Sequence, residues 1–507
     1  AFSGNDIDTD TISAAASQIY DLANNVATSN SVTLTPINTE PTFVTAGSGD
    51  GINIWSSATG DARGYGMTLL DDGKVLVSAQ VHTGTTNDFA LFRYNADGTL
   101  DTSFGGGSGY VTTDFLASND AGLSVEVLSD GKLLVSGYAS IGGDQDIGMA
   151  RYNADGSLDT SFGFSGVAVT DLGGIEVVDK MLIQDDGKIL VSGYTDTNGS
   201  NDYLIARFNA DGLLDTSFAG TGWVTGDWNG GFNDFGQDIL LQPDGKILIS
   251  SRGPAAVEEG GDGVDSTFNI ARYNSDGTLD TGFGGGNGFA AFNVNTGHDF
   301  PGGLALMPDG KILQVGDDNN TKDILVVRWN SDGTVDTTFG GGSGYVQIDP
   351  GLGASIHVGE DIHLLDDGKM IIVGRAIVAS GYDVMVMRLN ADGSLDTSFA
   401  GGDGAVITDI QGNHDYTGDS RLLADGSILV SGRAGNGTTD DLFLVRVNAD
   451  GTINTDFDGV STLDNTATYI QGGAPVILDA DVDIRDNELD ALNGGAGNYS
   501  GASITLV

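Results

Sequence analysis

One short pattern returns seven times along this chain and constrains its fold more than any other feature. It reads RYNADGTLDTSF at residues 93–104, and a second pattern, DDGKVLVS at residues 71–78, precedes it. Both recur with a period of 56 to 65 residues. Self-similarity at a fixed period of this size indicates a repeat architecture, in which each unit packs on its neighbours.

Each unit reads as four short strands. In the second unit they are LSVEVL (123–128), KLLVSGY (132–138), DIGMARY (146–152) and GVAVTDL (166–172). Asp-Gly marks a tight hairpin turn between the first two. Seven such units predict an all-β fold, a seven-bladed β-propeller of four-stranded blades over residues 46–464. A β-helix is the main alternative, but its coils are usually shorter than this period.

The fourth type of strand has one copy too many. GINIW (51–55) precedes the first unit, and GVSTL (459–463) follows the last. A closed ring of seven blades needs only seven such strands. We expect the N-terminal copy to pair into the seventh blade, because closure removes exposed strand edges.

The two ends of the chain do not follow the repeat. Residues 1–45 are expected to form a short, partly helical segment and linker, with DTISAAASQIYDLANNVATS (10–29) as the helix. Residues 465–507 are too few for an ordinary sandwich domain. They indicate an incomplete β module or a strand exchanged with another subunit. The chain is therefore expected to be a piece of a longer polypeptide or to complete a partner.

The composition is strongly acidic. The formal net charge is −50, the pI is about 4.1, and only seven of the 71 acidic residues are Glu. Aspartate favours turns over helices, and this charge repels nucleic acid, so no nucleic-acid partner is expected. No apolar run approaches the length of a membrane span, so no membrane insertion is expected. The absence of cysteine fits bacterial export without disulfides.

The repeat also resembles a known family. DGKxLVSG…ARYNADGxLDTSFGxxGxVxTD is similar to the delta-60 repeat of bacterial proteins over residues 47–464. INTEPTFVTAGSGDG (37–51) looks like the junctions between modules of large type I-secreted RTX-type adhesins, and residues 467–507 resemble the opening of a cadherin-like adhesin module. The resemblance implies a propeller in a protein that is secreted, extracellular or on the surface of a bacterium. It implies architecture more than activity.

The repeated motif has most of the spacing of a calcium loop, in which Asn95, Asp97 and Asp101 would be ligands. Its first ligand position, however, is Arg93. We expect the guanidinium to take the place of the metal and to donate to Asp101 or to loop carbonyls. The seventh copy keeps Arg446 but has Asn454 in place of the last aspartate, a loss that a metal site would tolerate poorly.

The motif is therefore predicted to be structural. The residues assigned to this role are Arg93, Asp97, Asp101, Arg151, Asp155, Asp159, Arg207, Arg272, Arg328, Arg388 and Arg446. The phenylalanine that ends each copy, such as Phe104, is expected to plug the space between blades. The lysine of each DGK turn is expected to be solvated.

The loops after the second and fourth strands share the opposite face of the predicted ring, where the copies differ. An Asx residue lies near the start of each third strand: Asp88, Asp146, Asp202, Asn269, Asp323, Asp383 and Asp441. Caps at the strand starts are the simpler interpretation. The alternative is calcium held by Asp144 with Asp146, Asp196 with Asp202, or Asp317 with Asp318. His298 and His414, with His357, are candidates for a transition-metal site at the channel mouth.

The same face carries a candidate ligand site. GWVTGDWNGGFNDF (222–235) interleaves aromatic residues with Asp and Asn, and the longest loop, 251–268, follows it. Rings stack on sugars while carboxylates and amides bind hydroxyls, so this composition suits carbohydrate. The predicted contacts are Trp228, Phe232, Asp234, Glu258 and Glu259.

These observations favour a non-enzymatic binding or structural module of a large secreted adhesin or matrix protein, with glycans or a surface polysaccharide as partner. A self-assembling filament subunit, joined to copies of itself through the terminal segments, is the alternative. A polysaccharide-acting enzyme is a third hypothesis, because propellers host such activities but fold alone does not give function. No nucleophile–base motif supports it, and calcium is the one cofactor that the sequence suggests.

Overall fold

The computed structural model describes residues 12–13, 31–32, 50–115, 118–228, 233–254, 266–294, 298–318, 321–352, 354, 356–378 and 381–458. The chain divides into two compact units, one of residues 47–460 and one of residues 1–46 and 461–507. In the second unit, β1 (Ile12–Ser13) pairs with β2 (Ser31–Val32). Two residues of the predicted helix therefore lie in a strand, and the rest of that helix lies outside the described residues.

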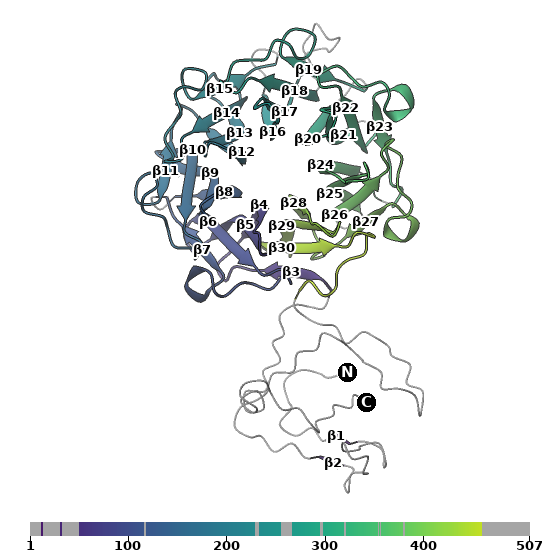
Figure 1. Ribbon diagram of the computed structural model, residues 1–507. Helices are drawn as coiled ribbons and strands as arrows, with labels where there is room; N and C mark the ends of the chain where they lie inside the picture. Colours follow the sequence, from purple (N-terminus) through teal and green to yellow (C-terminus); the bar gives the residue numbers. More distant parts are fainter. Residues whose placement is uncertain are drawn as a thin grey trace. The chain divides into compact units, whose positions relative to one another are not determined.

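Seven four-stranded antiparallel sheets form a ring, and each sheet is one blade of a propeller (Figure 1). The strands of blades one to three, from the channel outward, are β4 (Ala62–Leu69), β5 (Val75–His82), β6 (Asn87–Tyr94), β7 (Tyr110–Thr113); β8 (Asp120–Val127), β9 (Leu133–Ile141), β10 (Asp144–Tyr152), β11 (Val167–Thr170); β12 (Glu176–Ile183), β13 (Ile189–Thr195), β14 (Asp202–Phe208), β15 (Trp223–Gly226).

The remaining blades follow the same order. Their strands are β16 (Phe235–Leu241), β17 (Ile247–Pro254), β18 (Ser266–Tyr273), β19 (Phe289–Phe292); β20 (Asp299–Leu306), β21 (Ile312–Asp318), β22 (Asp323–Trp329), β23 (Tyr345–Ile348); β24 (Ile356–Leu364), β25 (Met370–Val378), β26 (Gly381–Leu389), β27 (Ala405–Thr408); β28 (Asp415–Leu422), β29 (Ile428–Gly435), β30 (Asp440–Val447), β3 (Ile52–Trp55). The predicted seven-bladed propeller is confirmed.

The ring closes through its N-terminal strand. β3 pairs with β30, with Ile52 opposite Val445 and Trp55 opposite Leu442. Asn53 also donates from Nδ2 to the carbonyl of Gly98 in the first blade at 2.7 Å. The prediction that the N-terminal copy completes the seventh blade is confirmed; the rival strand at 459–463 lies outside the described residues.

Hydrophobic clusters lie between neighbouring blades. Phe104, fully buried, packs with residues of the first and second blades, and Phe457 packs against the first blade from the seventh. The predicted role of the repeated phenylalanine as a plug between blades is confirmed. Among the described residues, no helix is long and apolar enough to span a membrane.

The motif arginine joins two blades in five of the seven copies. Arg93 donates from Nε to Asp101 Oδ2 at 2.7 Å and from Nη1 to the carbonyl of Ala154, in the turn of the next blade. Its guanidinium also lies 4.5 Å from the centre of the Phe104 ring. Both contacts predicted for this guanidinium are present. Copies of the tie to the next blade run from Arg151 to Ala210, Arg207 to Ser275, Arg272 to Ser331 and Arg388 to Ala449.

The prediction of solvated DGK lysines is wrong. Lys132 reaches Asp159 Oδ2 at 2.7 Å, the oxygen that also accepts from Arg151 Nε. The hairpin turn aims the lysine along the strands at the motif carboxylate, so two cations share one acid. The same lysine–aspartate pairs occur at Lys74–Asp101, Lys188–Asp215, Lys246–Asp280, Lys311–Asp336 and Lys369–Asp396.

Candidate functional site

The loops on one face of the ring repeat the same sequence, whereas the loops on the other face differ between blades. The DGK turns and the motif loops lie on one side of each blade, here called the motif face. The connections from the second to the third strand, and from the fourth strand to the next blade, lie on the other side, here called the variable face. Because the strands are antiparallel, this assignment follows from the order of each sheet.

A β-bulge interrupts the innermost strand of every blade. The register breaks fall at Gly64/Met67, Gly122/Ser124, Val178/Lys180, Gly236/Asp238, Pro301/Leu304, Gly359/Asp361 and Thr417/Asp419. A bulge re-aims side chains and is common beside functional sites. Here the bulged residues, among them Leu123, Asp179 and Glu360, line the central cavity.

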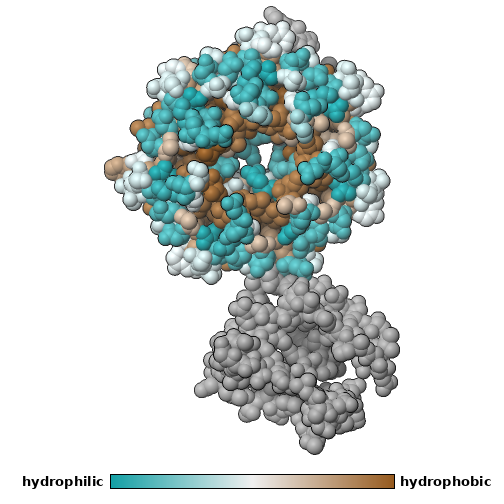
Figure 2. Space-filling model, in the orientation of Figure 1, coloured by the Kyte–Doolittle hydropathy of each residue, from teal (hydrophilic) through white to brown (hydrophobic). Residues whose placement is uncertain are grey.

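That cavity has a volume of about 540 Å³ and is lined by residues of all seven blades. Figure 2 shows the opening at the centre of the ring, with apolar residues around it and a polar rim outside. Tyr65, Phe300 and Tyr382 are aromatic residues of its wall, and Arg252 and Arg375 are its cations at the ends of second strands. We call this region, on the side of the variable face, the channel mouth.

Guanidinium groups stack on aromatic rings at the channel mouth. Arg252 lies 4.3 Å from the centre of the Phe300 ring. Arg375 lies 4.9 Å from Tyr382 and 5.0 Å from Tyr416, and Arg433 lies 4.4 Å from Tyr416. These cation–π pairs join blade four to blade five and blade six to blade seven.

Acidic groups at the channel mouth partly balance these cations. Glu360 Oε1 lies 3.1 Å from an Nη atom of Arg375. Burial, with the nearby charge of Glu360, raises the pKa of Asp317 to about 7. Burial also raises the pKa of Glu360. Near neutral pH the channel mouth therefore carries less negative charge than the acidic composition suggests.

The positions of the Lys and Arg residues outside the repeat also indicate that the candidate site lies at the channel. Seven Lys and Arg residues between positions 50 and 458 belong neither to the motif nor to a DGK turn. Six lie on the two strands of their blade nearest the channel, and Lys322 precedes β22: Arg63, Lys180, Arg252, Lys322, Arg375, Arg421 and Arg433. The cations outside the repeat therefore gather near the channel, where they face acids such as Glu360, Asp361 and Asp419.

Deeper in the channel, Asp419 binds two cations. Its Oδ1 lies 3.1 Å from Lys180 Nζ and 2.9 Å from Arg421 Nη1, and its Oδ2 accepts from the backbone N–H of Met67 at 2.8 Å. Asp238 makes a similar bond to the N–H of Leu304 in the next blade, at 2.7 Å. These side chains tie neighbouring inner strands together, which gives the channel network a structural role.

One serine and one histidine meet in this network. Ser420 Oγ lies 2.7 Å from His363 Nε2 and donates to Asp361 Oδ2 at 2.6 Å. In a nucleophilic triad the carboxylate binds the far nitrogen of the imidazole instead. Here the carboxylate and the imidazole nitrogen share one hydroxyl, and Ser420 is fully buried. This geometry is that of a packed polar cluster.

Acidic side chains also gather at the boundaries between blades on the variable face. In four boundaries, three carboxylates offer oxygens that lie within 4.8 Å of one another. One acid comes from a third strand, one from the connection to the next blade and one from the start of the next inner strand. The clusters are Asp88, Asp114 and Asp120; Asp146, Asp171 and Glu176; Asp202, Asp227 and Asp234; and Asp383, Asp409 and Asp415. A fifth cluster joins Asp323, Asp349 and His357.

These clusters differ from the predicted acid pairs. Asp146 and Asp202 are cluster members, whereas Asp144 and Asp196 are not. Asp196 instead accepts from the N–H of Ile175 at 2.6 Å. Asp144 is exposed at the start of β10. Metal binding by the predicted pairs stays a prediction; the carboxylates gathered in the clusters come from two neighbouring blades instead of one loop.

Asp317 and Asp318 point to different surroundings. Asp317 lines the channel mouth. Asp318 Oδ2 accepts from Thr321 Oγ1 at 3.2 Å and from Gln347 Nε2 at 2.9 Å. Successive residues of a strand face opposite sides, so these neighbours do not form one site. Metal binding by Asp317 and Asp318 stays a prediction, although the two side chains have different neighbours.

The histidines do not form a shared group. His298 stacks on Phe300, with ring centres 6.1 Å apart. His414 Nδ1 lies 3.2 Å from the N–H of Tyr382, and its ring packs against Tyr416. Neither joins a group of three metal-type ligands among the described residues. His357, in contrast, is buried inside a cluster.

In blade four, the residue predicted for the acidic position of the third strand is the wrong one. The third-strand acid precedes the motif arginine by five residues, as in Asp202 before Arg207, and pairs with Thr195 of the second strand. In blade four this register position, opposite Gly253, belongs to Thr267 rather than to Asn269. Thr267 donates to Asn269 Oδ1 at 2.7 Å, so the two residues are partners.

Of the predicted carbohydrate contacts, Trp228 and Asp234 are described, and Phe232, Glu258 and Glu259 lie outside the described residues. Trp228 donates from Nε1 to Ser251 Oγ at 2.7 Å and packs against Phe289. Asp234 is fully buried and belongs to an acidic cluster. Ligand binding by Trp228 stays a prediction, although its ring is half-buried and its N–H is already used.

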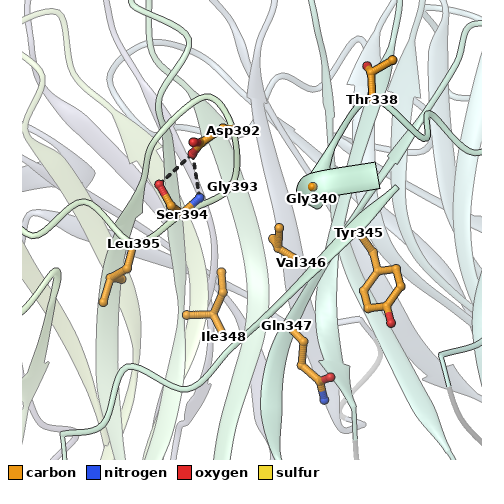
Figure 3. A pocket seen from close by; sticks show the side chains of 11 residues that line it. Thr338, Gly340, Tyr345, Val346, Gln347, Ile348, Asp392, Gly393, Ser394 and Leu395 are labelled. Carbon is orange, nitrogen blue, oxygen red and sulfur yellow. Dashed lines mark hydrogen bonds between the residues drawn. The ribbon is translucent and has the colours of Figure 1, made fainter. Parts of the chain in front are cut away.

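A second hollow lies beside the motif face. It has a volume of about 740 Å³ and lies between Tyr345–Ile348 and the turn at Asp392–Leu395 (Figure 3). Asp392 Oδ1 accepts from the N–H and the hydroxyl of Ser394, at 2.9 and 2.7 Å. This larger hollow is a groove between two copies of the repeat. Its charged group is occupied by the turn, so the channel mouth is the better candidate site.

Some residues of these candidate sites were not predicted from the sequence. The acids of the blade connections recur directly after the fourth strand in five repeats, as in VTTD at 111–114 and VITD at 406–409, so that column was visible. The channel residues Asp179, Lys180, Glu360 and Asp419 had no such signal. They reach the channel through bulges, which no residue pattern marked.

The closed ring of four-stranded sheets defines this protein as a seven-bladed β-propeller. Seven segments of the chain, one per blade, match the family described as "Domain of unknown function (DUF5122) beta-propeller": residues 70–104, 128–162, 184–218, 260–283, 308–339, 365–399 and 423–457. These segments cover the repeated motif in every blade and, except in blade four, the hairpin turn between the first and second strands. The match therefore covers the motif face and most connections from the second to the third strand, whereas the connections from the fourth strand to the next blade fall between its segments.

Comparison with other proteins adds little about function. None of the curated proteins matches this chain. Among solved structures, a virginiamycin B lyase from Staphylococcus aureus is 14% identical over 78% of this chain and 98% of its own, with a TM-score of 0.43. The polysaccharide lyase Uly1 is 11% identical over 78% and 91%, with a TM-score of 0.42, and Sqt1 from Chaetomium thermophilum is 10% identical over 80% and 89%, with a TM-score of 0.42. At these scores the likeness carries no functional argument.

Proposed function

We propose that this protein is a non-enzymatic binding module that holds a polysaccharide at the channel mouth. The observation that carries the proposal is the layer of stacked guanidinium and aromatic groups around the 540 Å³ cavity. Aromatic faces pack on sugar rings, and guanidinium and carboxylate groups bind hydroxyls and acidic substituents. The repeat motif supplies none of these groups.

The proposed setting is a large secreted adhesin or matrix protein of a bacterium. Its support comes from the sequence: the resemblance of the repeat and flanks to RTX-type adhesins, the acidity and the missing cysteine. A strongly acidic surface suits a medium with enough salt to screen it. A polysaccharide of the cell surface or matrix is the partner that this setting offers.

Binding to a panel of polysaccharides tests the proposal. The panel contains neutral dextran and the uronate polymers alginate and pectate, and the readout is surface plasmon resonance with the full chain. We expect at least one polymer to bind and Tyr416→Ala to lose most of that response, because Tyr416 carries two stacked guanidinium groups. Tyr345→Ala, beside the groove of the motif face, is the matched control and should bind normally.

Two results would count against the proposal. Absence of binding to every polymer would indicate a spacer without a ligand. Chain cleavage of a bound polymer, seen as new reducing or unsaturated ends, would show that the module is an enzyme.

A further inference from the structure

Three of the all-carboxylate clusters hold buried carboxylates that lie close together and keep an oxygen without a hydrogen-bond partner. Asp415 is fully buried and Asp383 is 4% exposed, and each keeps one buried carboxylate oxygen that has no hydrogen-bond partner. The same holds for Asp146 and Asp234, at 4% and 0% exposure. A buried charge without a partner is costly, so such a group calls for a cation or a proton.

Each cluster has a similar geometry. Two members are buried, and the third, from the connection between blades, is exposed, as Asp409 is beside Asp383 and Asp415. An ion bound there would have protein oxygens on its inner side and water on its outer side. Calcium takes six to eight oxygen ligands and accepts this mixture of carboxylates and water.

The other two boundaries of the ring show that the three positions change together. At the boundary of blades four and five they are Thr267, Asn293 and Asp299, and at the boundary of blades seven and one they are Asp441, Ser56 and Ala62. Each of these boundaries keeps a single carboxylate, so two acids are missing at once. Acids that served only as separate loop caps would have no reason to disappear in pairs.

A capping role does exist, but it does not account for the whole cluster. Asp415 Oδ2 accepts from the N–H of Ile410 at 2.8 Å, and Asp234 Oδ2 accepts from the N–H of Trp228 at 2.9 Å. In both residues the second oxygen is the one without a partner. One carboxylate oxygen therefore holds the loop, while the other remains for a ligand.

We propose that the three all-carboxylate clusters that keep such an oxygen are calcium sites on the variable face, at the boundaries of blades two and three, three and four, and six and seven. In the cluster of Asp88, Asp114 and Asp120, both oxygens of Asp88 and of Asp120 already accept hydrogen bonds. Each ion would join a third strand, the connection that follows it and the inner strand of the next blade. Calcium would thus lock neighbouring blades on this face, as the motif arginines do on the other. The proposal does not depend on what the channel mouth binds.

The raised pKa values of two buried carboxyl groups agree with the geometry of the clusters. Burial, with the charges of Asp227 and Asp202, raises the pKa of Asp234 to about 8. Burial, with the charges of Asp409 and Asp383, raises the pKa of Asp415 to about 7. Carboxyl groups of this kind are the ones that a divalent cation would return to the ionised form.

The fifth cluster provides an internal contrast. It replaces one carboxylate by the imidazole of His357, which is 2% exposed and has no hydrogen-bond partner on either ring nitrogen. Nitrogen suits zinc and other transition metals better than calcium. We expect this cluster to contribute little to calcium binding.

Equilibrium dialysis with radioactive calcium tests the proposal on the full, chelator-treated chain. We expect saturable binding with dissociation constants on the order of 10⁻⁴ M, as in extracellular calcium modules. The double variant Asp383→Asn/Asp415→Asn should bind one ion fewer per chain. Asp299→Asn, which removes a lone carboxylate from the boundary of blades four and five, should bind as many ions as the wild type.

Melting without calcium shows whether the double variant folds. Because it neutralises two crowded carboxylates, its melting temperature in chelator should equal or exceed that of the wild type. Calcium should raise the melting temperature of the wild type more than that of the variant, since only binding to the folded state stabilises it. Equal stoichiometry and equal calcium response in the wild type and the double variant would overturn the proposal. Absence of calcium binding to the wild type at millimolar concentration would assign the clusters to shared protons instead.

Discussion

In the seventh blade, Arg446 donates from Nε to Ser427 Oγ at 3.0 Å, where the arginines of the first six blades donate to an aspartate at 2.7 Å. This blade has lost both partners of the usual cluster: Ser427 replaces the DGK lysine, and Asn454 replaces the aspartate. Arg446 turns to Asp425 as its ion-pair partner. The lysine and the aspartate therefore behave as one unit, as their shared carboxylate oxygen in the other blades indicates.

Restoring the pair in blade seven should stabilise the ring. We expect Ser427→Lys/Asn454→Asp to be more stable than the sum of the two single variants by about 0.5–3 kcal/mol, the usual range for groups in contact. Chemical denaturation of the four chains in a double-mutant cycle measures this coupling. Strict additivity would show that the two positions are independent.

The motif carboxylates make the ring sensitive to acid. Burial alone would raise the pKa of Asp280, but hydrogen bonds from Lys246, Arg272 and the N–H of Gly282 outweigh it and lower the pKa to about 2. A depressed pKa contributes stability that is present above the ordinary carboxyl value and is lost as pH falls toward the folded value. The pKa of the equivalent acid is lowered in five other blades: Asp101, Asp159, Asp215, Asp336 and Asp396.

We therefore expect the free energy of unfolding to fall steeply between about pH 4 and pH 2. Urea titrations at a series of pH values check this, and Asp280→Asn should flatten the fall because it removes one of the titrating groups. A wild-type protein whose stability is constant over that range would contradict the role assigned to these acids.

Closure of the ring depends on a few contacts of β3. Trp55 packs edge-on against Phe92 and Tyr110 of the first blade, with ring centres 4.8 and 5.0 Å apart. We expect Trp55→Ala to destabilise the propeller by about 2–4 kcal/mol, somewhat below the cost for a fully buried aromatic, because the ring is half-buried. Ile54→Ala, an exposed residue of the same strand, is the control and should change stability little. Equal losses in both variants would contradict a specific closing role for Trp55.

The sequence predicted the motif face closely because that face is built from local signals. Asp-Gly turns, the repeated arginine and phenylalanine, and the extra N-terminal strand all specify contacts that recur in each blade. The Arg93 contact to Asp101 could be predicted since the two residues lie in one hairpin. The Lys74 contact could not, because it requires knowing that the turn points the lysine back along the strands.

The variable face was harder to predict because its sites combine segments from two blades. Asp202 was identified, but its partners Asp227 and Asp234 come from the connection to the next blade and from the start of the next inner strand. The stacked arginine and aromatic residues of the channel mouth were not predicted for the same reason: Arg375 and Tyr416 belong to different blades and meet only when the ring is closed. Chain neighbours such as Asp317 and Asp318 diverge because strand residues alternate between faces.

The central claim of this account is that the motif face holds the ring while the channel mouth binds the ligand. Blade six offers a matched pair of arginines, Arg375 on β25 at the channel mouth and Arg388 on β26 in the motif. Titration calorimetry with the best-binding polysaccharide, together with thermal melting, compares Arg375→Ala with Arg388→Ala. We expect Arg375→Ala to lose at least about tenfold in affinity, or about 1.4 kcal/mol, with little change in melting temperature. Arg388→Ala should melt earlier and bind normally. Unchanged affinity in Arg375→Ala, or lost affinity in a folded Arg388→Ala, would contradict the claim.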